Sequence, residues 1–462
     1  MSRMGGKAAF AALMIIASGC TPALKPLPAG VSSQPPLAWR TQLTTTATLE
    51  LDWWRRFGDS RLTELVEKAR ANNLDVRIAS ARVDEARATE AISRSLLLPT
   101  VEVGVQGGAQ REVSAFGQGQ NALALQPLFR ASYEIDLFGR NAIRVEGAAA
   151  ATAANEAARE ATLLSVSAAT ASGYVTLLAL DGRLAILKRT LQARGDALKF
   201  ARDRASVGYT SQLELRQAEA EYQATALLVP QVETQIARQE NALSILVGEL
   251  PAATIRGGTL SNLKLPAAPD VLPSELLRRR PDVAAAEYRL AASDAQMRFA
   301  RAKFLPTIGI SATAGAAFSD LLANPVSIWS LGGSVLAPIF AGGRLTGEYD
   351  AAAARRDQAA YAYRSTVLNA FREVEDRMVT LDRLAAQKEA LMAQRTAVAD
   401  ALRHARNRYQ AGYTAYIEQV DAQRSLLGVE LSIIQLEADM FNAMIGLYQA
   451  AGGGPEANGA PL

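Results

Sequence analysis

Two long stretches of the chain place apolar residues at spacings that alternate between three and four. They run from residue 215 to 250 and from residue 417 to 448. Such a seven-residue repeat predicts helices that pack as coiled coils. The few polar positions on these seams include Thr225 and Gln239 in the first stretch and Arg424, the one charge in the second.

The stretch from Arg140 to Val207 has no proline and is rich in alanine. Proline breaks helix interiors and alanine favours them. We therefore expect one helix of roughly seventy residues there, which at 1.5 Å per residue is on the order of 100 Å long.

Four other segments follow a period of two, with apolar residues alternating with polar residues or glycine, as Val103 does with Glu102. We expect strands near residues 98–112, 122–137, 304–316 and 327–340. Each alternating core is about ten residues long, which suits a tilted strand that crosses a bilayer. Proline precedes each pair of strands and glycine follows it, as helix gives way to strand and then resumes.

The two halves of the chain repeat each other. Leu98-Pro99-Thr100 matches Leu305-Pro306-Thr307 at an offset of 305 − 98 = 207, and Gly208 matches Gly412 at an offset of 412 − 208 = 204. Repeats of this kind predict a fold built from two copies of one unit. The expected divisions are a signal segment 1–19, an extended N-terminal segment 20–58, a first repeat 59–250 with its hairpin at 98–137, a proline-rich linker 251–273, a second repeat 274–451 with its hairpin at 304–340, and a disordered tail 452–462.

Four strands cannot close a barrel, and an open edge in lipid would leave backbone groups unpaired. The chain is therefore expected to oligomerise. Single-chain barrels have at least eight strands, so a dimer would leave little bore, whereas three copies supply 3 × 4 = 12 strands. The predicted fold class is an α+β membrane protein, with a trimeric 12-stranded barrel continued by long coiled-coil helices.

Composition excludes several other classes of function. The chain has 49 Lys and Arg against 46 Asp and Glu, without the clustered basic surface that nucleic-acid binding needs. One Cys, Cys20, and one His, His404, leave too few ligands for a structural zinc site. No phosphate-binding Gly-x-x-x-x-Gly-Lys-Ser/Thr loop occurs. We expect no enzyme activity, no cofactor and no metal.

The N-terminus resembles a bacterial lipoprotein signal. Arg3 and Lys7 precede an apolar stretch, residues 8–17, that is too short to span a bilayer. Small residues stand directly before Cys20, which we expect to become the acylated first residue of the mature chain. The alternative is an ordinary secretory signal with a free thiol nearby. Thr21 is not the aspartate that typically retains such lipoproteins at the inner membrane, so the outer membrane is favoured.

Five motifs carry a resemblance to a known family over residues 53 to about 447. They are Trp53-Trp54-Arg55-Arg56-Phe57-Gly58-Asp59, Tyr133-Glu134-Ile135-Asp136-Leu137-Phe138-Gly139-Arg140, Leu277-Arg278-Arg279-Arg280-Pro281-Asp282-Val283, Phe340-Ala341-Gly342-Gly343-Arg344 and Ala422-Gln423-Arg424-Ser425-Leu426. With them the chain resembles the TolC-like outer membrane factors, most closely the OprM/NodT-like lipoprotein branch that serves RND-type tripartite efflux systems.

The resemblance implies a homotrimeric outer membrane duct that exports drugs or other small amphiphilic compounds. Its implied partners are a periplasmic adaptor, an inner-membrane RND transporter and outer membrane lipid. Two alternatives stay open: the exit channel of a protein secretion system, which shares the fold, and a non-channel coiled-coil lipoprotein. The second would leave the four alternating segments without a purpose.

The resemblance also assigns roles near two helical turns, which the family uses to meet its adaptor. The turns here are Gly208-Tyr209-Thr210 and Gly412-Tyr413-Thr414. Glu418 and Asp421 match the family's acidic ring at the periplasmic gate, and Glu214 and Tyr409 match contacts that hold the closed state. Thr414 stands where the best-known member has arginine, so that part of the lock is not carried over. The two acids could instead be ordinary solvated helix residues.

Overall fold

The computed structural model describes residues 21–30, 35–43, 46–113, 117–320 and 323–453, and they form two compact units. The first, here called the sheet unit, contains Arg82–Glu156 and Ala285–Ser365 together with the described residues before position 34. The second, the helix unit, contains Gln34–Ala81, Ala157–Ala284 and the chain from Thr366 onward.

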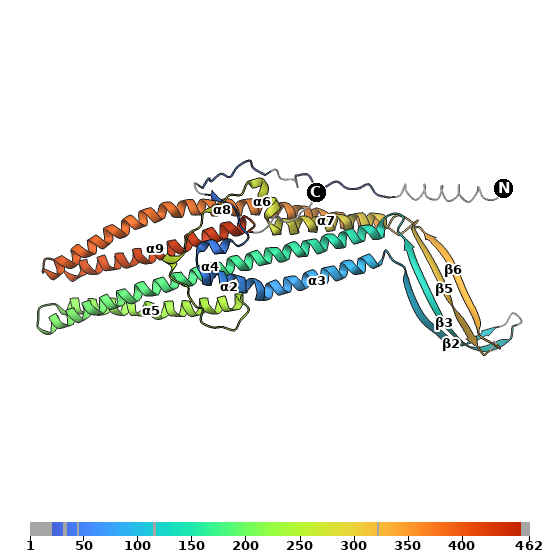
Figure 1. The fold of residues 1–462 in the computed structure, drawn as a ribbon, viewed down its shortest axis with the longest axis horizontal. Coiled ribbons are helices and arrows are strands. Elements are labelled where there is room, and N and C mark those ends of the chain that lie inside the picture. Colours follow the sequence, from blue (N-terminus) through green and yellow to red (C-terminus); the bar gives the residue numbers. More distant parts are fainter. Residues whose placement is uncertain (1–20, 31–34, 44–45, 114–116, 321–322, 454–462) are drawn as a thin grey trace. The chain divides into compact units, whose positions relative to one another are not determined.

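The elements of the two halves repeat in order and in length (Figure 1). A helix of 22 residues is followed by a hairpin of strands, a helix of 67 residues and a helix of 35 residues in both halves. The first half has α3 (Leu74–Ser95), β2 (Thr100–Val113), β3 (Gly119–Ile135), α4 (Arg140–Ser206) and α5 (Gln212–Leu246). The second has α7 (Pro281–Ala302), β5 (Thr307–Ser319), β6 (Val326–Leu336), α8 (Arg344–Gln410) and α9 (Tyr416–Ala450).

The sheet unit holds a four-stranded antiparallel sheet in the order β2-β3-β5-β6. Its register places Val103, Phe129, Ala314 and Trp329 in one row across the four strands. Because side chains alternate along each strand, the neighbouring row, which contains Glu102, Arg130, Thr313 and Ser330, faces the other way. One face is therefore apolar and the other polar, although Val103 and Trp329 are 70% and 80% exposed in the single chain.

The strands differ from their expected bounds at the ends. β5 begins at Thr307 and not at residue 304, because Pro306 stands immediately before it. β6 ends at Leu336 and not at residue 340, ahead of Pro338, which has no N–H to donate. β3 starts at Gly119, three residues earlier than the alternation indicated, and pairs there with Val113.

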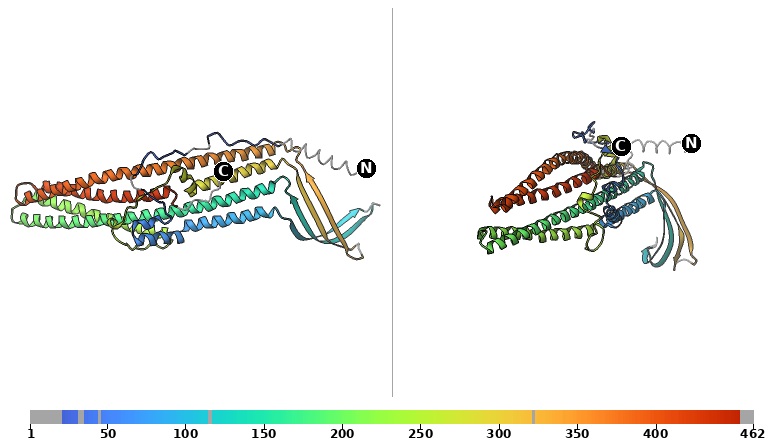
Figure 2. Two further views of the ribbon diagram at one scale, coloured as in Figure 1. Left: turned by 45° about the horizontal axis from the view of Figure 1, so that its top comes forward. Right: turned by 60° about the vertical axis from the view of Figure 1, so that its left-hand side comes forward.

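The helix unit contains two helical hairpins. One is formed by α5 with the part of α4 from Ala157 onward, the other by α9 with the part of α8 from Thr366 onward. The two members of each hairpin lie side by side in both views of Figure 2. Tyr174, Leu177 and Leu187 of α4 are fully buried. Within the described residues, α4 alone is long and apolar enough to cross a membrane, and 56% of its most apolar window is buried inside the protein. Its apolar stretch thus packs against other parts of the chain.

Two segments expected to lack regular structure contain short elements. The N-terminal segment includes β1 (Thr46–Ala47), which pairs in parallel with β4 (Ala268–Pro269) of the linker, and the 3-10 helix η1 (Trp53–Phe57). The linker also contains a second 3-10 helix, η2 (Leu260–Asn262). Long-range packing produces this order: Trp53 is fully buried and stacks on Tyr448 with ring centroids 5.4 Å apart. The tail beyond residue 453 and the signal segment lie outside the described residues.

The ends of α5 and α9 are anchored in the same way. Asn73 follows α2 (Ser60–Asn72), and its Nδ2 donates to the carbonyl of Leu246, the last residue of α5, at 2.9 Å. Arg280 follows α6 (Pro273–Arg279), and its Nη1 donates to the carbonyl of Ala450, the last residue of α9, also at 2.9 Å. Corresponding positions of the two repeats thus bind the orphan carbonyls of corresponding helices.

Candidate functional site at the helical turns

A glycine in the left-handed conformation ends each long helix of the helix unit. Gly208 follows α4 with φ of 77°, and Gly412 follows α8 with φ of 79°. Side chains are strained at such angles, whereas glycine is not. The next residues, Tyr209 and Tyr413, donate their N–H groups to the carbonyl five residues earlier, both at 2.9 Å. Both tyrosine side chains are exposed, so each turn presents an aromatic ring to its surroundings.

The two turns differ in how the returning helix begins. Ser211 caps α5, because its Oγ accepts the N–H of Glu214 at 3.2 Å. The matching residue before α9 is Ala415, which has no side-chain oxygen, and no side-chain cap is present there. Its φ and ψ of −72° and 153° nevertheless match the −78° and 154° of Ser211. The backbone at Ala415 thus has the conformation of a capping residue, but alanine has no side-chain oxygen to make the cap.

The structure brings Tyr409 and Glu214 together, although they are 195 residues apart. The Tyr409 hydroxyl donates to the Glu214 carboxylate at 3.4 Å, and the Thr210 hydroxyl also bonds that carboxylate. Tyr409 packs on Tyr416 with ring centroids 5.3 Å apart, and both side chains are buried. Burial, reinforced by the Glu214 charge, raises the pKa of Tyr409 above its ordinary value. The phenol is therefore a proton donor at neutral pH, as the contact requires.

Glu418 and Asp421 lie on one exposed side of α9, one helical turn apart. Each has an arginine nearby in the same chain. Arg408 Nη1 is 4.0 Å from a Glu418 oxygen, and Arg424 Nη1 is 3.5 Å from an Asp421 oxygen. The acids are thus available to face a channel, but they are partly balanced within their own chain.

A buried ionic cluster near the turns was not predicted. The side chain of Glu221 of α5 is 8% exposed, and its carboxylate lies 2.9 Å from Arg194 Nη1 of α4. The same carboxylate accepts a hydrogen bond from Arg424 Nε of α9 at 2.9 Å. Arg194 Nη1 also donates to the carbonyl of Glu221 and the hydroxyl of Thr225. This cluster joins α4, α5 and α9. The sequence marked this cluster only indirectly, through Arg424 and Thr225, which are polar residues on otherwise apolar seams.

Two other predicted positions add little to this site. Thr414 has a buried Oγ1 without a hydrogen-bond partner among the described residues, so it makes no contact that would replace the family's arginine. Cys20, the expected lipidation site, lies outside the described residues. Within the part of the chain that the structure describes, no group of three or more His, Cys, Asp or Glu side chains could hold a metal ion.

Known proteins resemble this chain over most of its length. The sequence model of the family described as "Outer membrane efflux protein" matches residues 65–249 and 272–453, two segments that correspond to the two repeats. The pyoverdine export outer membrane protein OpmQ of Pseudomonas putida is 31% identical over 94% of this chain and 95% of its own. The toluene efflux pump outer membrane protein TtgC of the same species is 31% identical over 90% of this chain and 87% of its own.

A solved structure, described as a membrane protein from Pseudomonas aeruginosa, superposes with a TM-score of 0.84 at 28% identity. The alignment covers 94% of this chain and 100% of that one. The match therefore includes the strands as well as the helices. With the family's sequence model covering both repeats, the chain belongs to the outer membrane efflux protein family.

Proposed function

We propose that this outer membrane efflux channel is the exit duct of a tripartite RND-type pump that exports drugs or other small amphiphilic compounds. The observation that carries the proposal is that relatives aligned over almost the whole chain are outer membrane components of export systems for small molecules, toluene and pyoverdine among them. The partners would be a periplasmic adaptor and an inner-membrane RND transporter.

The adaptor is proposed to dock at the two glycine turns. Tyr209 and Tyr413 are 77% and 80% exposed, and aromatic rings are common anchors of protein interfaces. The turn backbone depends on Gly208 and Gly412, whose left-handed φ no larger residue adopts without strain. Substitution of either glycine should therefore weaken the binding of a partner that docks on these turns.

The gate is proposed to combine the acids of α9 with the contact between Tyr409 and Glu214. Glu418 and Asp421 would supply 3 × 2 = 6 carboxylates to a ring in the trimer. Tyr409 and Glu214 hold the end of α8 to the start of α5, so opening would have to break their hydrogen bond. Lipidation of Cys20 is proposed as an additional attachment to the outer membrane.

A transport assay with matched variants tests the proposal. The chain would be produced with an adaptor and an RND pump in a host that lacks its own outer membrane channel, and efflux of a fluorescent amphiphilic dye would be recorded. Export should appear with the natural chain and fall sharply with Gly208→Val combined with Gly412→Val. Gly428→Ala is the control, since a Cβ at Gly428 of α9 meets no atom within 4 Å.

The outcomes separate the alternatives. Full export by the double valine variant, with normal trimer levels, would contradict docking at the turns. Failure of the natural chain to export any dye, combined with secretion of a protein through a matching secretion transporter, would favour the secretion channel. A chain that supports neither process and forms no pore would leave the coiled-coil lipoprotein as the answer.

A further inference from the structure

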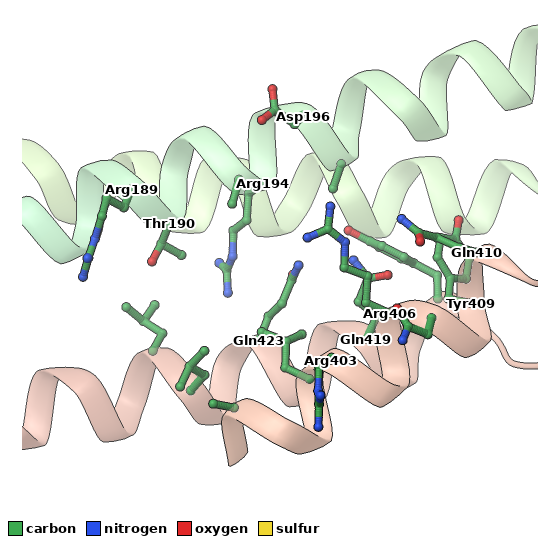
Figure 3. Close-up of a pocket in the computed structure, with 18 of the residues that line it drawn as sticks. Arg189, Thr190, Arg194, Asp196, Arg403, Arg406, Tyr409, Gln410, Gln419 and Gln423 are labelled. Carbon is green, nitrogen blue, oxygen red and sulfur yellow. The ribbon is translucent and has the colours of Figure 1, made fainter. Parts of the chain in front are cut away.

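A cleft of about 910 Å³ opens in the helix unit between α4 on one side and α8 with α9 on the other. Figure 3 shows Arg189, Thr190 and Arg194 on α4 facing Gln423 across this space. The volume is in the range of pockets that enclose drug-sized molecules. Tyr409 of the proposed gate is one of the lining residues, but neither the channel function nor the gate assigns a ligand to the cleft.

The cleft is rich in positive charge. Four arginines and two acids contribute to its lining: Arg189, Arg194, Arg403 and Arg406 against Asp196 and Glu430. Glu430 is already shared between Arg189 at 3.9 Å and Arg395 at 3.4 Å. Arg406 forms no ion pair with any residue that the structure describes. Arg194 is paired with Glu221 at 2.9 Å, and Arg403 with Asp400 at 3.0 Å. An anionic group in the cleft would therefore find one uncompensated cation, Arg406, beside three arginines that are already paired.

Buried polar atoms in the same place lack partners. Gln419 is 6% exposed, and its Oε1 has no hydrogen-bond partner among the described residues. The same is true of Oε1 of Gln423 and of Nε of Arg194, a residue only 5% exposed. Since buried polar groups are normally hydrogen-bonded, these three atoms give the lining of the cleft unused hydrogen-bonding capacity. A glutamine amide can rotate to donate its Nε2, so all three side chains can donate to an anion.

The remaining lining is apolar. Phe200 of α4 faces the cleft, and Leu402 of α8 and Leu426 and Leu427 of α9 also contribute to it. An occupant that satisfied only the arginines would leave this apolar surface in contact with water. The combination fits a molecule with an apolar or aromatic body and one or more acidic groups.

We propose that this cleft binds a drug-sized organic anion, an aromatic or aliphatic molecule that carries carboxylate or sulfonate groups. The ligand's acidic groups bond Arg194, Arg406 and the glutamines, and its body packs on the leucines. Because the ligand touches both helical hairpins, it favours the arrangement that forms the cleft over any arrangement that separates them. The site does not depend on the proposed RND partnership, and ligand binding is measurable without transport.

Calorimetric titration of the purified full-length trimer with 1,5-naphthalenedisulfonate, corrected with a detergent blank, tests the proposal. We expect saturable binding with one site per chain. Arg406→Gln and Gln423→Met should each weaken it about tenfold, the usual effect of losing a hydrogen bond to a charged group. Arg383→Gln is the matched control, because Arg383 lies on α8 outside the cleft and its side chain is 74% exposed.

Three results would overturn the inference. The first is a titration in which the heat of binding does not saturate. The second is the same affinity for the disulfonate in the Arg406→Gln and Arg383→Gln variants. The third is binding of the uncharged 1,5-naphthalenediol with the same affinity as the disulfonate. Arg406 is exposed and unpaired with described residues, so its substitution should leave the fold intact. Size-exclusion chromatography of each variant would verify the trimer before titration.

Discussion

At the scale of single residues, Ala415 marks a difference between the two repeats, because it lacks the side-chain oxygen with which its repeat partner caps a helix. The repeat partner, Ser211, caps α5, whereas α9 begins without a cap on a backbone of nearly the same φ and ψ. Glu418 of the proposed gate lies in the first turn of α9. The gate is therefore located at the helix start that lacks a side-chain cap. A weaker end opens more readily at a lower cost in free energy.

Ala415→Ser should therefore stabilise the start of α9 by about 1 kcal/mol, the usual worth of an N-cap. Hydrogen exchange of amides in the first turn of α9 should slow roughly fivefold, which is the factor that 1 kcal/mol represents at 25 °C. Ser211→Ala is the mirror control and should accelerate exchange at the start of α5. Unchanged exchange in Ala415→Ser would mean that packing, and not capping, holds this helix end.

The acids of α9 give a second residue-scale prediction. Glu418→Gln with Asp421→Asn should reduce cation preference and divalent-ion block of single channels, because charges within a Debye length of about 8 to 10 Å concentrate cations. Conductance in planar bilayers measures both effects. Asp382→Asn with Glu389→Gln removes the same charge from α8 and should change neither. Unaltered selectivity in the first variant would show that Glu418 and Asp421 are solvated surface residues.

At the scale of elements, the sheet register decides which side chains meet lipid. Val103 stands in the row with Phe129 and Trp329, whereas Glu102 stands opposite Arg130 on the polar face. Val103→Lys should destabilise the barrel by about 2–4 kcal/mol at mid-membrane depth, and Glu102→Lys by much less. Reversible urea unfolding in lipid vesicles provides the measurement. Equal losses in both variants would contradict the assignment of faces.

The elements also show what the sequence could and could not predict. The period of two predicted the strands, the period of seven predicted α5 and α9, and the absence of proline predicted α4. Each of these signals depends on neighbours along the chain. The order in residues 46–57 and in the linker was missed, since β1 pairs with β4 more than two hundred residues away and Trp53 stacks on Tyr448. The Glu221 cluster was missed for the same reason, although Arg424 and Thr225 marked its place. Contacts between distant segments leave only such indirect traces in one sequence.

At the scale of the whole molecule, three chains of the family's homotrimer supply twelve strands to a closed barrel in the outer membrane. Closure pairs the free edges of β2 and β6, the terminal strands of each four-stranded sheet. The barrel already anchors the protein in lipid. An acyl chain on Cys20 would then contribute to targeting more than to membrane affinity.

Lipidation is tested by metabolic labelling with a palmitate analogue. Label should be present in the natural protein and absent from Cys20→Ala, because Cys20 is the only thiol in the sequence. The variant should still reach the outer membrane to some extent through its barrel, which membrane fractionation can measure. Label retained by Cys20→Ala would contradict acylation at this residue.

The matched helix lengths have a consequence for how such a protein can change in size. α4 and α8 each have 67 residues and α5 and α9 each have 35, and every hairpin is held at both ends, by Asn73 or Arg280 at one and by the Tyr409 contact at the other. Removing seven residues from one helix would shift its end by about 10 Å and break these contacts. Shortening is tolerable only if all four helices lose the same heptad together. The lengths of the four helices are therefore expected to change together. Chimaeras between relatives whose helices differ in length should exchange both hairpins at once.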